Sequence, residues 1–156
     1  MILDPSTLSD AAVRLCIAAA GVFFMTGLVT GVWKYAHIAR SPTATAPVYV
    51  DLCHRAALLY SFASLLLAQF AALSRWSPSV NLVASAGPLL FFAAAIGGYA
   101  IHGALRDTDN QFLAPHRLGS RTLPGSMVHG FMWILVAVEI GGFGVLLAGA
   151  WPRLFS

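Results

Sequence analysis

The chain has 156 residues, of which 58% are hydrophobic and only 10% are charged. A soluble domain carries about 25% charged residues, so the composition excludes an ordinary soluble fold and predicts one integral membrane domain over residues 1–156. The net charge of +3 comes from eight arginines and one lysine near the ends of the apolar runs. These basic residues form no continuous tract of the kind that binds nucleic acid.

Four apolar runs follow one another, and each is long enough to cross about 30 Å of hydrocarbon as a helix. Pro88 falls inside the third run, where neighbouring helices can accept the freed carbonyl. Pro124 is expected in the first turn of the fourth run. We therefore expect an all-α, four-helix transmembrane bundle with spans at about 11–35, 50–73, 82–105 and 123–151.

The basic residues are unevenly shared between the two sides of this bundle. The side of the first and third loops carries six, namely Lys34, Arg40, Arg55, Arg106, Arg117 and Arg121. The opposite side carries three, namely Arg14, Arg75 and Arg153. Positive loops stay in the cytoplasm, so we expect both termini to face outward from a bacterial-type inner (plasma) membrane.

The five histidines all fall near the loop-rich, basic side. His54 lies about one turn inside the second span, His102 one turn before the third ends, and His129 one turn inside the fourth. His37 ends the first span, and His116 lies in the third loop. Any one of these alone would be an interfacial side chain, but ionisable residues at one membrane depth indicate a functional site. The site we expect is a metal or haem centre.

Haem fits this pattern better than zinc, because the spans show no closely spaced ligand pair and no HExxH motif. A four-helix bundle can hold a porphyrin through one or two axial histidines. Arg55, Arg106 and Arg117 lie at the edge where propionates need cations, although they could equally mark only the cytoplasmic side. Glu139, near mid-membrane, is expected to face the bundle interior or a subunit interface.

Glycines suggest that the helices pack closely. Gly27 and Gly31 form a GxxxG pair, and the fourth span carries Gly141, Gly142 and Gly144. Such small residues let helices approach one another, and we expect them to support homo-oligomer contacts as well.

The chain resembles the small four-span membrane isomerases typified by styrene oxide isomerase, with hydroxylaminobenzene mutases as distant relatives. The resemblance lies in the length, the four spans, His54 and the Asn110-Gln111-Phe112 triplet after the third span. It implies that His54 ligates a haem b at the subunit interface of a trimer. It also implies that ferric iron acts as a Lewis acid on a small apolar epoxide, which rearranges to an aldehyde.

The chain differs from that family at Tyr60 and in its additional histidines. Tyr60 stands where the family has an asparagine, and Tyr99 is the nearest candidate for the tyrosine of the third span, with Leu105 as the alternative. Tyr60, Tyr99 and Asn110 are the catalytic candidates. His102 and His129 exceed the needs of a one-ligand site, so they predict either a second ligand or a second haem.

Two functions therefore compete. An isomerase needs an open iron position beside a small hydrophobic substrate. A bis-histidine or dual-haem protein would exchange electrons with a redox partner or sense redox state. A haem-free structural subunit is a third interpretation.

Overall fold

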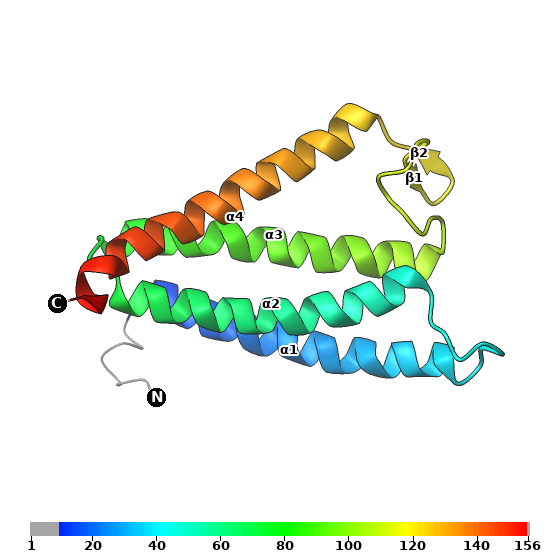
Figure 1. Ribbon diagram of the computed structural model, residues 1–156, viewed down its shortest axis with the longest axis horizontal. Helices are drawn as coiled ribbons and strands as arrows, with labels where there is room; N and C mark the ends of the chain where they lie inside the picture. Colours follow the sequence, from blue (N-terminus) through cyan, green and yellow to red (C-terminus); the bar gives the residue numbers. More distant parts are fainter. Residues whose placement is uncertain (1–9, 156) are drawn as a thin grey trace.

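The computed structural model describes residues 10–155, and within them four long helices run antiparallel in a bundle (Figure 1). Each helix is long and apolar enough to cross a membrane, which confirms the all-α four-span fold. The helices are α1 (Ala11–Ile38), α2 (Val48–Leu73), α3 (Pro78–Leu105) and α4 (Gly125–Leu154). A two-residue hairpin, β1 (Arg117–Leu118) and β2 (Arg121–Thr122), interrupts the third loop.

The helix ends follow local capping chemistry. The Asp10 side chain accepts a hydrogen bond from the Ala12 N–H at 2.8 Å and so caps α1. Ser77 caps α3, with Pro78 in its first turn, so α3 begins four residues earlier than hydropathy alone predicts. Pro124 precedes α4 as its cap residue instead of lying in its first turn. Hydropathy marks the lipid-embedded part of a helix, whereas caps mark its true ends.

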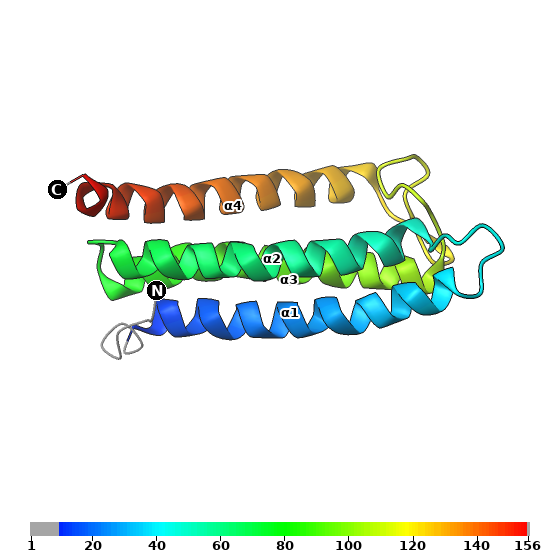
Figure 2. The ribbon, with the colours of Figure 1, turned by 60° about the horizontal axis from the view of Figure 1, so that its bottom comes forward.

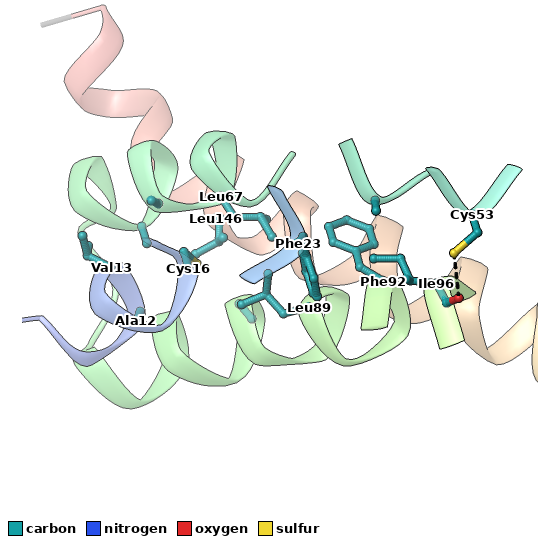
Figure 3. Close-up of a cluster of buried hydrophobic side chains, with 14 residues drawn as sticks. Ala12, Val13, Cys16, Phe23, Cys53, Leu67, Leu89, Phe92, Ile96 and Leu146 are labelled. Carbon is teal, nitrogen blue, oxygen red and sulfur yellow. Dashed lines mark hydrogen bonds between the residues drawn. The ribbon is translucent and has the colours of Figure 1, made fainter. Parts of the chain in front are cut away.

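Small side chains fill much of the bundle interior. Alanines and two cysteines pack among a few larger residues such as Leu89, Phe92 and Leu146 (Figure 3). Several serines are buried as well. The Cys53 thiol donates to the Ile96 carbonyl at 3.7 Å, the contact drawn in the same figure. Small residues allow helices to pack closely in a membrane, where lipid supplies no hydrophobic drive for association.

Gly27 and Gly31 serve this packing within the chain. A β-carbon on Gly27 would lie 3.3 Å from the Leu58 backbone nitrogen, and one on Gly31 would lie 2.9 Å from His54 Cε1. Both glycines therefore face α2 of the same chain, so this pair serves packing within the protomer and not the oligomer contact that the motif predicts. Gly141 and Gly144 on α4 have open space beside them.

Helix α4 packs closely on the bundle only toward its C-terminal end. There the Trp76 indole donates to the Val145 carbonyl at 2.8 Å, and Gly142 lies directly against α3. Toward the third loop α4 diverges from α3 (Figure 1). Only 11% of its most apolar window is buried, against 44% for α3, so most of its surface is left for lipid or another subunit.

The third loop is folded onto the end of the bundle. Its hairpin pairs Arg117 with Thr122 around Gly119, whose φ of +62° suits glycine. The Gln111 N–H donates to the Tyr49 hydroxyl of α2 at 2.6 Å. The first and third loops project from the same end of the bundle (Figure 2).

Candidate functional site

The structure brings all five histidines to the end of the bundle that carries the first and third loops. It does not, however, gather them around one point: His54 contacts α1, whereas His102 and His116 line a cavity beside α3 and α4. No group of three histidine, cysteine or carboxylate side chains converges within residues 10–155. The arrangement therefore offers single imidazoles and pairs, each with its own neighbours.

His54 lies in the seam between α1 and α2. Its Nδ1 lies 2.8 Å from the Gly27 carbonyl oxygen, which can only accept, so Nδ1 carries the proton and the neutral ring keeps its lone pair on Nε2. Gly31 makes room for the ring, because a β-carbon there would crowd Cε1. A carbonyl that fixes one ring nitrogen while the other stays basic is the usual support of a histidine ligand.

Two cations, Arg55 next to His54 in α2 and Lys34 of α1, share the Asp51 carboxylate. Lys34 Nζ lies 2.5 Å from Asp51 Oδ1, and Arg55 donates to Asp51 Oδ2 at 3.3 Å. Arg55 was predicted from the sequence as a cofactor contact. Lys34 was missed, although its position three residues after Gly31 was a usable signal. Together they make a positively charged edge near His54.

His102 has a different environment at the end of α3. Its Nδ1 donates to Asp107 Oδ1 at 2.8 Å, and the two side chains are 9% and 4% exposed. The Tyr49 ring lies 5.0 Å from the imidazole, between centroids. The Gly119 N–H donates to the other oxygen of Asp107. Burial alone would raise the pKa of Asp107, but the hydrogen bonds from Gly119 and His102 outweigh it and lower that pKa.

A cavity of about 250 Å³ opens between α3 and the diverging half of α4, beneath the third loop. Its walls are apolar side chains and small residues of the two helices, including Gly98, Phe131 and Leu135. Its polar lining groups are Tyr60, Tyr99, His102, Gln111, His116 and Arg117. His54 does not line this cavity.

The predicted catalytic residues are divided by this geometry. Tyr60 and Tyr99 both line the cavity, and Tyr60 stacks on Phe92 at 4.3 Å between ring centroids. Asn110 lies outside the cavity lining, where its side-chain oxygen accepts the Phe112 N–H at 3.0 Å and shapes the loop.

The remaining predicted cofactor contacts are also spread out. A guanidinium nitrogen of Arg106 lies 3.3 Å from Nδ1 of His37, and Arg117 lines the cavity. His129 is exposed on α4, edge-on to His116 at 5.5 Å. Of the three arginines predicted to contact the cofactor, only Arg55 lies on the same helix as His54.

Glu139 lies partly buried on α4. Its Oε1 is enclosed, and it has no hydrogen-bond partner among the residues that the structure describes.

Comparisons with protein-family models, with curated proteins and with solved structures find no match. The fold and the histidine-rich end define the class directly. The chain is a small four-span α-helical membrane protein.

Proposed function

We propose that this four-span protein binds haem b through His54 and isomerises a small apolar epoxide, as the resemblance to styrene oxide isomerase implies. The observation that carries the proposal is the orientation of the His54 ring. Its Nδ1 is committed to the Gly27 carbonyl, which leaves the Nε2 lone pair for a metal ion. A helix-bound imidazole in this tautomer is already prepared for ligation.

The surroundings of His54 suit a porphyrin. Exposed apolar side chains such as Leu28, Val32 and Leu59 cover the adjoining outer faces of α1 and α2. Lys34 and Arg55 would hold the propionates at the membrane edge, where cations pair with carboxylates. The outer face of α1 and α2 is apolar and exposed. We propose that the neighbouring protomer of a homotrimer covers it and completes the pocket.

Bound ferric haem supplies a Lewis acid that polarises the carbon–oxygen bond of an epoxide. His54 would hold the iron as its one histidine ligand, through the lone pair on Nε2. The Gly27 carbonyl keeps the ring in its ligating tautomer and orientation. The apolar faces exclude water, so a rearranging substrate is protected from hydrolysis.

The alternative of two histidines on one iron finds less support within one chain. His54 packs against α1, whereas His102 lines the cavity between α3 and α4 and is tied to Asp107. His129 lies on α4, where it is exposed, and does not line that cavity. A second haem on these residues would need its own site.

We further propose that the first and third loops face the cytoplasm of a bacterial inner membrane. Six basic residues on their side against three on the other support this orientation.

The test is to purify the protein with haem available and compare the wild type with His54→Ala. We expect a Soret band in the wild type and its loss in the variant, together with loss of aldehyde formation from an aryl epoxide. His37→Ala is the matched control, because His37 lies at the same end but outside the proposed pocket. Full haem retention by His54→Ala would overturn the assignment.

A further inference from the structure

We propose that the cavity between α3 and α4 is a separate binding site for a small, mostly apolar molecule that carries a hydroxyl group. The hydroxyl would donate its hydrogen bond to Nε2 of His102. This inference does not rest on the haem proposal, because His54 does not line the cavity.

The first argument is the state of His102. Because Asp107 accepts from Nδ1, the neutral form of the ring has its lone pair on Nε2, which can then accept a hydrogen bond. His102 is 7% exposed and lines the cavity. Nε2 has no hydrogen-bond partner within residues 10–155. Since the His102 side chain lines the cavity, we place the free Nε2 on the cavity side.

The second argument is that the surroundings hold His102 in place. The Asp107 carboxylate is itself fixed by the Gly119 N–H, and the Tyr49 ring covers the imidazole. A buried acceptor with a fixed ring selects ligands by their donor group, since a ligand without one leaves the acceptor unsatisfied. An O–H group matches this acceptor, and Tyr99 beside it offers a second hydroxyl.

The volume of the cavity limits the size of the apolar part of the ligand. A cavity of about 150 Å³ with apolar walls binds benzene, so about 250 Å³ holds one substituted ring with some space to spare. The walls from α3 and α4 are alanine, glycine, methionine, phenylalanine and leucine. A single-ring phenol combines this apolar body with one donor.

Neighbouring glycines on α3 provide a matched pair of variants. Gly97 and Gly98 both have open space where a β-carbon would be, but only Gly98 lines the cavity. Gly98→Leu therefore fills the cavity while it keeps both His102 and Asp107 in the chain. Gly97→Leu makes the same change outside it. His102→Phe keeps an aromatic ring and removes the acceptor, and His37→Phe is its control.

The experiment measures binding of para-cresol to the full chain in lipid nanodiscs by calorimetry, with empty nanodiscs subtracted. Para-xylene, which replaces the hydroxyl by a methyl group, is the comparison ligand. We expect saturable cresol binding in the wild type, Gly97→Leu and His37→Phe. We expect its loss in Gly98→Leu and about tenfold weaker binding in His102→Phe and for para-xylene.

Three results would overturn the proposal. The first is the absence of saturable cresol binding to the wild type. The second is unchanged binding in Gly98→Leu, which would place the ligand elsewhere. The third is equal affinity for para-cresol and para-xylene, which would remove the role of the hydroxyl. A haem-free but cresol-binding protein would contradict the proposed function alone.

Discussion

Asp107→Ala should release the third loop from the end of α3. The carboxylate accepts from the Gly119 N–H and from His102, and its side chain is 4% exposed. A hydrogen bond to a charged group contributes about 1.5–3 kcal/mol, and burial leaves little solvent screening here. If the hydrogen bond from Gly119 contributes about 2 kcal/mol, the Gly119 amide of Asp107→Ala should exchange with solvent deuterium roughly thirtyfold faster than that of the wild type.

Hydrogen exchange followed by mass spectrometry on the third-loop peptides measures this change. Asp109→Ala is the control, because Asp109 lies in the same loop and is exposed. Unaltered protection of Gly119 in Asp107→Ala would refute the reasoning.

The same contact has a pH dependence. The pKa of Asp107 is lower in the folded protein than in the unfolded chain. The carboxylate therefore contributes fully to the stability of the folded loop above the unfolded pKa of about 3.9. This contribution is lost as the pH falls through the lower folded value. Protection of Gly119 that disappeared well above pH 3.9 would contradict this sign.

Three further predictions concern close packing and orientation. Gly31→Ala places a methyl group 2.9 Å from the His54 ring, so the haem content measured by absorbance should fall. The control Gly21→Ala has open space around the added methyl group and should keep the haem content of the wild type. Gly142→Ala would place a methyl 2.6 Å from a backbone carbonyl oxygen of α3 and should cost about 1–3 kcal/mol, seen as a lower Tm than that of Gly141→Ala. The Ser120→Cys variant should react with a membrane-impermeant maleimide only in inverted vesicles. Labelling in intact spheroplasts would contradict the proposed orientation.

The four spans could be predicted because lipid imposes length and hydropathy on each helix separately. The depth of His54, His102 and His129 followed from the same constraint, since position along a helix fixes depth. Depth does not fix which way a side chain points or which helix it meets. The pairing of His102 with Asp107 therefore became visible only in the structure.

Two other features depend on contacts between helices. The Gly27–Gly31 pair has the pattern of an oligomer interface, but a neighbouring helix of the same chain occupies it. The cavity depends on the divergence of α4 from α3, which results from packing at one end and a folded loop at the other. The hairpin at 117–122 is too short to leave a strand pattern in the sequence.

The most direct measurement is the haem content and absorption spectrum of the purified wild-type protein. The proposal predicts one haem b per protomer with a single histidine ligand and an open position that binds an added ligand such as imidazole. A protein purified without a Soret band after haem supply, or one whose reduced spectrum shows the sharp bands of two histidine ligands, would contradict it.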